Sequence, residues 1–202
     1  MTTVCSPPKL VLATRNTHKA AELKLLLASA SADVMDLSAF PDAPSVNETA
    51  SSLEENAALK ALSAYDHTGL WALGDDTGLC IDALNGQPGV HSARFAGIKK
   101  DDLDNRALVL QMLANETNRR AQFITILALA YSGGLKYFRG CLSGHIATSE
   151  MSTKGFGYES IFVPEGSNVS LAQLSREEKN EISHRGRSAA KLLDFLNEIQ
   201  TQ

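Results

Sequence analysis

The feature that most constrains the fold is a pair of long β-rich segments, "QFITILALAY" (residues 122–131) and "LKYFRGCLSGHIA" (135–147). Only a short junction containing Ser132, Gly133 and Gly134 separates them. A short glycine-rich junction between two strand-like runs is typical of a β-hairpin. The chain therefore must accommodate a hairpin of two long strands.

Strands and helices alternate before that hairpin. "KLVLATR" (residues 9–15) has the apolar content of a short buried strand, and "DVMDL" (33–37) is a candidate second strand. The helix predicted between them has one apolar face, made of Ala20, Leu23, Leu26 and Leu27. A second helix is predicted over residues 52–65. Its start has the capping-box spacing of Ser52 and Glu55, and its apolar stripe contains Ala58, Leu62 and Tyr65.

The remaining elements follow the same logic. Residues 70–76 and then 79–84 are expected to be strands, followed by a glycine-rich loop (85–97), a helix (101–115) and, after the hairpin, a last strand (159–164). A C-terminal helix from about His184 presents one apolar side, made of Ala189, Leu192, Leu193, Leu196 and Ile199. An early strand–helix alternation combined with a hairpin predicts an α/β protein with a mixed sheet. No Pro/Gly-rich linker divides the sequence, so we expect a single domain over residues 1–202.

Composition narrows the function classes. The 202 residues, 44% of them hydrophobic, suffice for a sizeable core. A formal charge of −4 argues against a general nucleic-acid binder, although a few local cations can still bind a small anion. Cys5, Cys80 and Cys141 lack the spacing of a metal site or a disulfide framework, which favours reduced thiols. No signal peptide or membrane span is apparent, and we expect a cytoplasmic protein without a membrane partner.

The segment "TRNTHK" lies between the first predicted strand and helix and contains Thr14, Asn16 and Lys19. A helix N-terminus offers unpaired N–H groups and partial positive charge, and a lysine adds a full charge, so this turn could cradle phosphate. It is not a Walker motif. The alternative is ordinary helix capping beside a solvated lysine.

The segment "GDDTG" places Asp75 and Asp76 directly after an apolar run, with Glu48 in an upstream loop. Strands are poor in Asp, and two adjacent carboxylates repel each other. A shared divalent cation would offset that repulsion, and Mg²⁺ usually takes one or two protein carboxylates together with phosphate oxygens and water. The alternative is a turn in which one Asp is a cap and the other is solvated.

Two further polar segments occur late in the chain. In "KGFGYES" (residues 154–160), glycines flank Phe156 and could expose its ring for stacking on a planar base, although such a ring is more often core. "REEKNEISHRGR" (176–187) combines Lys179, His184 and Arg185, with Ser183 as a candidate N-cap. These cations could meet phosphate, or they could form a solvated helix start.

Taken in order, these segments resemble the inosine/xanthosine triphosphate pyrophosphatase family. The resemblance covers about residues 9–196 and rests on "LATRNTHKAAEL", "LEENAALKA", "GDDTGLCIDALNGQPGVHSARFAG", "GFGYESIFVP" and "EEKNEISHRGRSAAKLL". It implies an elongated mixed α/β fold of two lobes with a central cleft, usually found as a homodimer. It also implies a Mg²⁺-dependent enzyme that cleaves aberrant purine nucleoside triphosphates such as ITP, dITP and XTP to the monophosphate and pyrophosphate.

The resemblance also assigns roles to residues. Asp76 would be a metal ligand and the proton acceptor, with Asp75 and Glu48 as further metal ligands. The residues implied to bind substrate are Thr14, Arg15, Asn16, Thr17, His18, Lys19, Thr77, Phe156, Gly157, Tyr158, Glu159, Lys179, His184 and Arg185. In the mechanism that we expect, Lys19, with Lys60 and Lys179 as possible helpers, would balance the phosphate charge. Donors from His184 and Arg185 would recognise the 6-oxo group of the base.

The sequence departs from the family pattern in two places, which together cover three positions. The family commonly has Ser where Thr77 stands, and Asp-Pro where Glu159 and Ser160 stand. The second departure lies in the implied base pocket, so a pyrophosphatase acting on modified pyrimidines or another aberrant base is the nearest alternative. A nucleotide sensor that binds without cleaving is a more distant one.

Overall fold

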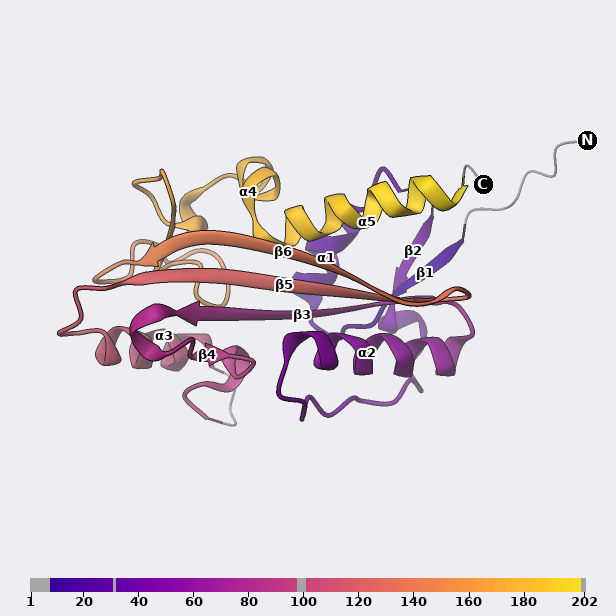
Figure 1. Cartoon of the computed structure of the whole chain (residues 1–202), viewed down its shortest axis with the longest axis horizontal. Helices are drawn as coiled ribbons and strands as arrows, with labels where there is room; N and C mark the ends of the chain where they lie inside the picture. The colour runs from indigo at the N-terminus through magenta and orange to yellow at the C-terminus, as the bar shows by residue number, and fades with distance from the viewer. Residues whose placement is uncertain (1–7, 31, 98–100, 201–202) are drawn as a thin grey trace, which may run out of the picture. The chain divides into compact units, whose positions relative to one another are not determined.

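The computed structural model describes residues 8–30, 32–97 and 101–200 (Figure 1). Its strands are β1 (Lys9–Leu12), β2 (Asp33–Asp36), β3 (Trp71–Ile81), β4 (Pro88–Gly89), β5 (Arg120–Tyr131), β6 (Gly134–Ile146) and β7 (Phe162–Pro164). Its α-helices are α1 (Thr17–Leu26), α2 (Leu53–Thr68), α3 (Asp102–Met112), α4 (Arg176–Ile182) and α5 (His184–Gln200). Short 3₁₀ turns are η1 (Leu37–Ala39), η2 (Asp82–Leu84), η3 (Ser92–Arg94) and η4 (Leu171–Gln173). None of the helices in these ranges is long and apolar enough to cross a membrane.

The strands form one mixed sheet, which confirms the predicted fold class. Its order is β2-β1-β3-β5-β6-β7, and β4 pairs with β3. β1 is parallel to both β2 and β3, whereas β4 is antiparallel to β3 and β7 is antiparallel to β6. The expected hairpin is present, because β5 and β6 are neighbours joined by residues 132–133.

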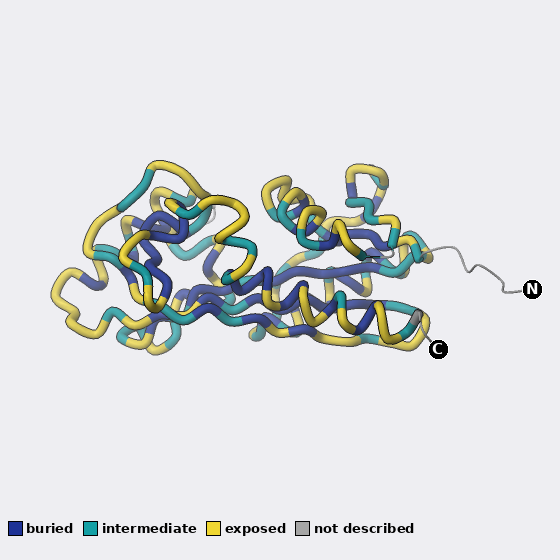
Figure 2. The backbone as a smooth tube through the Cα atoms, turned by 90° about the horizontal axis from the view of Figure 1, so that it is seen from above, coloured by how far each residue is buried: buried dark blue, intermediate teal, exposed yellow. Residues whose placement is uncertain are grey.

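The described chain divides into two compact units. Unit 1 comprises the described residues within 1–76, 126–138 and 188–202, and unit 2 comprises those within 77–125 and 139–187. The boundaries fall inside β3, β5, β6 and α5, so each of these elements contributes residues to both units. β1, β3, β5 and β7 are buried along most of their length, whereas β2 has no buried residue and β6 alternates buried with more exposed ones. Buried and exposed stretches of the backbone are coloured in Figure 2.

Unit 1 packs its sheet residues against helices on two faces. On one face, Leu12 and Leu73 join Leu23 of α1 and Leu192 of α5 in a buried cluster. On the other face, Val11 and Ala72 belong to a separate cluster with Ala64 of α2. The alternation of side chains along a strand explains the division, because neighbouring residues point to opposite faces.

Helix α2 lies very close to β3. A Cβ atom at Gly74 would stand 2.0 Å from the carbonyl oxygen of Ala57, so only glycine fits there. The helix face in contact is correspondingly small, and Ala57, Ala61 and Ala64 are buried. The predicted stripe was wrong at Leu62, which is 42% exposed, because it lies about 100° around the helix from Ala61.

Unit 2 has its own apolar core. Leu79 and Ile81 of β3 pack with Val109 of α3, Phe123 of β5 and Phe162 of β7. Phe123 and Phe162 are in direct ring contact, with centroids 4.7 Å apart. Part of the segment after β6 belongs to this core as well, through Tyr158, Ile161 and Leu171.

Several predicted boundaries were wrong. β3 is continuous from Trp71 to Ile81, so the two aspartates lie within a strand and not at its end. β1 ends at Leu12 and β7 begins only at Phe162, so both are shorter than predicted. Helix α4 was not expected; a capping box of Ser175 and Glu178 begins it. Cys80 and Cys141 are free thiols, and Cys5 lies outside the described residues.

Candidate active site

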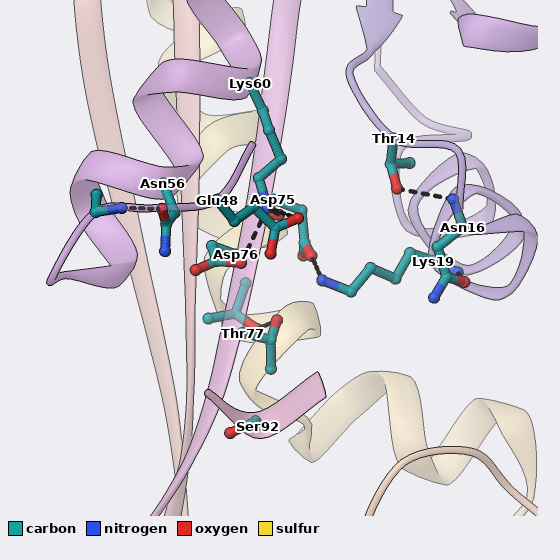
Figure 3. Close-up of polar contacts among 12 residues, drawn as sticks. Thr14, Asn16, Lys19, Glu48, Asn56, Lys60, Asp75, Asp76, Thr77 and Ser92 are labelled. Atoms are coloured by element: carbon teal, nitrogen blue, oxygen red, sulfur yellow. Dashed lines mark hydrogen bonds and ion pairs between the residues drawn. The ribbon is translucent and has the colours of Figure 1, made fainter. Parts of the chain in front are cut away.

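The phosphate-binding segment predicted in unit 1 forms the turn into α1. Asn16 is the N-cap, and its side chain accepts a hydrogen bond from Lys19 N at 3.1 Å. Thr14 Oγ1 accepts from Asn16 N at 3.1 Å, which fixes the turn before the helix (Figure 3). Arg15, Asn16, Thr17 and His18 are exposed. The turn therefore presents a helix N-terminus to solvent, as anion binding requires.

Asp75 and Asp76 point to different faces of β3. Asp75 lies two residues after Leu73 and therefore on the same face of the strand. It forms an ion pair with Lys19 of α1 (Figure 3). Asp76 lies on the same face of the strand as Gly74. On that face Lys60 of α2 donates from Nζ to Asp76 Oδ1 at 2.9 Å. Each carboxylate thus has its own lysine, which explains why two adjacent aspartates are tolerated inside a strand.

Lys60 connects three parts of unit 1. Besides Asp76, its Nζ donates to the Asp75 carbonyl oxygen at 2.5 Å and lies 3.6 Å from Glu48 Oε1. The loop that carries Glu48 is thereby drawn towards the same ammonium group as Asp76. The sequence suggested Lys60 only as a helper for phosphate charge, but in the structure it also organises the carboxylates.

The environment of Asp76 favours its protonated form. Burial raises the pKa of Asp76 above its ordinary value, and the neighbouring Glu48 acts in the same direction, while Lys60 and Lys19 oppose the rise. Asp76 Oδ2 is buried and accepts no hydrogen bond from any residue that the structure describes. A buried carboxylate oxygen without a partner costs free energy unless a ligand or water satisfies it.

Asn56 was not predicted as part of the site. It is fully buried on α2, one turn before Lys60, and its Oδ1 accepts from Ala50 N at 3.1 Å. Asn56 therefore ties the loop that carries Glu48 to the helix that carries Lys60 (Figure 3). Its presence on the buried face of a helix was the available sequence signal, because buried amides need partners.

No group of three or more His, Cys, Asp or Glu side chains that could hold a metal ion occurs among residues 8–30, 32–97 and 101–200. The carboxylates of Glu48 and Asp76 both approach Lys60 Nζ. Two carboxylates match the small number of protein ligands that Mg²⁺ takes when substrate oxygens and water complete its shell.

The residues predicted for the base in unit 2 gather around Phe156. Lys179 Nζ lies 5.2 Å from the Phe156 ring centroid and donates to Glu159 Oε1 at 2.9 Å. The other oxygen, Glu159 Oε2, accepts from Phe156 N at 3.3 Å. Glu159 is buried, whereas Phe156 is half-buried. Glu159 is thus held at both carboxylate oxygens.

The start of α5 brings together a second set of predicted residues. Ser183 caps this helix as expected, since Gly186 N donates to Ser183 Oγ at 2.9 Å. Arg185 is only 2% exposed, and its Nη2 donates to Thr77 Oγ1 at 3.1 Å. Thr77 Oγ1 also lies 2.7 Å from Thr125 Oγ1, a contact that the sequence did not suggest because Thr125 stands in an apolar strand.

His184 is buried against an aromatic ring. Its imidazole stacks on Phe123, with centroids 4.6 Å apart and planes inclined by 14°. Tyr158, another predicted substrate residue, is buried, and its hydroxyl donates to the Ser92 carbonyl oxygen at 2.7 Å. Burial of the ring raises the pKa of Tyr158 well above its usual range, which keeps this donor protonated.

The predicted residues therefore form two groups, one in each unit. Unit 1 assembles a helix N-terminus, two lysines and three carboxylates, and unit 2 assembles an aromatic ring with the half-buried Lys179, the buried Arg185 and the Glu159 carboxylate. Taken separately, the cations of unit 1 suit an anionic ligand group and the aromatic ring of unit 2 suits a planar one, which indicates a nucleotide-binding protein as the class.

Comparison with known proteins agrees with this class. The model of the Ham1 family matches residues 10–195. A protein of an Exiguobacterium species named dITP/XTP pyrophosphatase is 45% identical over 91% of this chain and 94% of its own length. A Streptomyces avermitilis protein of the same name is 42% identical over 95% of this chain and 98% of its own. The structure of a HAM1 protein from Coxiella burnetii has a TM-score of 0.86 and 37% identity, covering 95% of this chain and 99% of that one.

The chain belongs to the Ham1 family. The shared name of its relatives confirms the family resemblance and the predicted enzyme class, a hydrolase that acts on nucleoside triphosphates. The fold class is confirmed by the Coxiella structure.

Proposed function

We propose that this protein is a Mg²⁺-dependent pyrophosphatase that hydrolyses non-canonical purine nucleoside triphosphates, such as ITP, dITP and XTP, to the monophosphate and pyrophosphate. The observation that carries the proposal is the buried Asp76 carboxylate, which has a raised pKa and one oxygen without a partner among the described residues. A raised pKa makes a carboxylate a better proton acceptor near neutral pH.

In the proposed reaction, the oxygen of a water molecule bonds to the α-phosphorus while the bond to the α–β bridging oxygen breaks. The bridging oxygen leaves with pyrophosphate, and Asp76 accepts one proton of the water. Positioning and charge stabilisation supply most of the rate enhancement in such phosphoryl transfers. Asp76 is suited to orient the water because Lys60 fixes its Oδ1 and so holds the carboxylate in one orientation.

In the proposal, cationic groups of unit 1 bind the triphosphate and balance its negative charge. Lys19 and the α1 N-terminus bind phosphate oxygens, and Lys60 adds a second cation. Lys19 is paired with Asp75 in the structure described here, so phosphate competes with that carboxylate for the ammonium group.

Glu48 and Asp76 would hold the magnesium ion, with Asp75 as a further carboxylate nearby on β3. The unpartnered Asp76 Oδ2 and the all-oxygen donor set fit this hard cation. When bound, Mg²⁺ supplies charge neutralisation of the phosphate oxygens.

Unit 2 recognises the base. Phe156 offers a face for stacking, and its position is set by Glu159 and Lys179. Donors from His184 and Arg185 select the 6-oxo group, which adenine lacks. A site built on hydrogen bonds rejects a mismatched partner by roughly 10⁴ or more, which a purely apolar slot cannot do.

A substrate panel tests the proposal. Purified protein with Mg²⁺ is given ITP, dITP, XTP, GTP, ATP and dUTP, and pyrophosphate and orthophosphate are measured separately. We expect pyrophosphate release with kcat/KM highest for ITP, dITP or XTP. Equal kcat/KM for all purines would contradict the selectivity, preference for dUTP would favour the pyrimidine alternative, and tight binding without pyrophosphate release would favour a sensor.

The oligomeric state and the partners of the protein are a separate part of the proposal. Family resemblance favours a homodimer, and we propose that state for this chain too, with no nucleic-acid partner because of its net charge of −4. Light scattering at several concentrations measures the mass directly. A mass of 21.7 kDa at assay concentration would contradict the dimer.

A further inference from the structure

Residues 154–160 form a loop around Phe156, here called the Phe156 loop. Its backbone is held by side chains that the proposed function does not use. Gly157 has a left-handed backbone, with φ +59°, and a Cβ there would meet nothing within 4 Å. Glycine is thus favoured by the conformation itself and not by lack of space. Its N–H donates to Asp102 Oδ2 at 2.6 Å, and its carbonyl oxygen accepts from Arg106 Nη1 at 2.9 Å.

Both partners of Gly157 come from one face of α3. Asp102 and Arg106 stand four residues apart on the helix, so their side chains project side by side. Arg106 is buried, and its Nε donates to Glu150 Oε1 at 2.8 Å, which fixes the guanidinium group independently of Gly157. Asp102 lies in the first turn of α3, where the helix dipole favours a carboxylate.

Helix α3 is itself anchored to the segment that holds Tyr158. Asn105 is buried, its Oδ1 accepts from Ala96 N at 2.7 Å, and its Nδ2 donates to the Ala93 carbonyl oxygen at 3.4 Å. Within the same segment, the Ser92 carbonyl oxygen accepts from the Tyr158 hydroxyl. The loop is therefore connected to α3 both directly at Gly157 and indirectly through η3.

We infer that Asp102 and Arg106 are positioning residues that hold the Gly157 peptide and thereby determine how the Phe156 loop receives the base. The inference rests on the proposed function of that loop. Charge-assisted hydrogen bonds are stronger than neutral ones. The bonds from Asp102 and Arg106 to Gly157 therefore hold the peptide in one orientation. Neither side chain is among the carboxylates of unit 1 that the proposed reaction uses, Glu48, Asp75 and Asp76. Their loss therefore weakens base binding and leaves the chemical step largely intact.

Asp102→Ala tests the inference, with Asp104→Ala as the matched control. Both variants remove a first-turn carboxylate from α3, but Asp104 is exposed and Asp102 alone accepts from Gly157 N. If the hydrogen bond to the charged Asp102 is lost, the binding free energy that depends on it is lost as well. The KM for ITP should then rise about tenfold or more. We expect that rise for Asp102→Ala with kcat within about twofold of wild type, and no change for Asp104→Ala.

Binding measurements separate the base from the phosphates. Calorimetry with inosine monophosphate is expected to show about tenfold weaker binding by Asp102→Ala, whereas binding of pyrophosphate stays unchanged. Asp102→Asn keeps an acceptor oxygen and should restore most of the affinity. Arg106→Lys, which cannot serve Glu150 and Gly157 through one planar fork, provides a second variant should Asp102→Ala not fold.

The outcomes distinguish this inference from the proposed function. If wild type releases pyrophosphate from ITP but neither Asp102→Ala nor Arg106→Lys changes KM or the affinity for inosine monophosphate, the inference is wrong and the function stands. A fall in kcat at constant KM, or an equal effect of Asp104→Ala, would also overturn it. If wild type neither cleaves ITP nor binds inosine monophosphate, both fail together.

Discussion

At the scale of single residues, opposing effects act on the charge of the Asp76 carboxylate. Its carboxylate is buried next to Glu48, which disfavours the charge, and beside Lys60, which favours it. Functional carboxylates are commonly placed in such environments because a shifted pKa suits proton transfer. Asp75, its neighbour, is bound by Lys19 on the other face of β3, so the two adjacent residues have different surroundings.

Replacing Asp76 by Asn should therefore abolish most of the activity. The amide cannot accept the proton of the attacking water, and loss of a general base costs about 10²-fold or more in rate. The measurement is kcat for pyrophosphate release from ITP with saturating Mg²⁺. Asp66→Asn, which changes an exposed carboxylate of α2, is the control and should retain wild-type kcat. Near-normal turnover by Asp76→Asn would exclude the role as proton acceptor.

The same substitution should stabilise the fold at neutral pH. Because the folded state raises the pKa of Asp76 above the ordinary value of 3.8, this group contributes stability only while protonated. That contribution is complete below about 3.8 and is lost as pH rises through the folded-state pKa. Asparagine has no proton to lose and keeps its contribution.

Urea unfolding in metal-free buffer at a series of pH values measures the effect. The free energy of unfolding of wild type should decline relative to that of Asp76→Asn as pH increases from about 4, and the difference should level off above the folded-state pKa. A difference that does not vary with pH would show that burial does not disfavour the Asp76 charge.

At the scale of elements, the close contact of α2 with β3 positions Lys60 over Asp76. Gly74 permits the contact, and the alanine face of α2 completes it. Ser52 begins the helix by accepting from Glu55 N at 3.2 Å, and Gly69 ends it in a left-handed conformation, with φ +66°. Helix ends and packing together therefore determine where Lys60 lies along the strand.

Gly74→Ala should separate this helix from the strand. The new Cβ would stand 2.0 Å from Ala57 O and 2.9 Å from Ala61 N, and both atoms belong to the backbone. Overpacking of this kind costs about 1–3 kcal/mol in the free energy of unfolding. We expect a lower thermal midpoint and, because Lys60 moves with α2, a lower kcat.

A second substitution identifies the cause. Ala57→Gly in the Gly74→Ala background removes a side chain but leaves the clashing carbonyl oxygen, so stability should not recover. Recovery would mean that the Ala57 methyl group, and not the backbone, limits the approach of the helix.

At the scale of the whole molecule, the sequence predicted the elements better than it predicted the contacts between them. Apolar periodicity identified the buried faces of α1 and α5, where Leu23 and Leu192 are fully buried, and the glycine junction identified the β5–β6 hairpin. These features depend on local order along the chain. The end assigned to β3 was wrong because lysines distant in sequence compensate its two aspartates.

The candidate site shows the same division. Motifs predicted Lys19, Asp76, Phe156 and Lys179, because helix termini, carboxylates, glycines and cations are visible in a sequence. The residues that hold neighbouring parts of the site were not found: Thr125 contacts Thr77, Asn56 holds the backbone at Ala50, and Asp102 and Arg106 hold the Gly157 peptide. Each of these lies in an otherwise ordinary strand or helix, and only tertiary packing brings it to the segment that it holds.

Removal of divalent metal should stop catalysis without unfolding the protein. The apolar clusters of both units, around Leu73, Ala72 and Phe162, contain none of the carboxylates proposed to hold Mg²⁺. With excess EDTA we expect pyrophosphate release from ITP to cease while near-ultraviolet circular dichroism is unchanged, and added Mg²⁺ should restore the rate. Ca²⁺ should restore it poorly, because it prefers six to eight oxygen ligands in a looser arrangement.

The Glu48→Gln variant should need more Mg²⁺ than wild type for a half-maximal rate, since the substitution removes one carboxylate from the set near Lys60. Full activity in EDTA would refute the metal requirement, and loss of the near-ultraviolet signal would instead assign the ion a structural role.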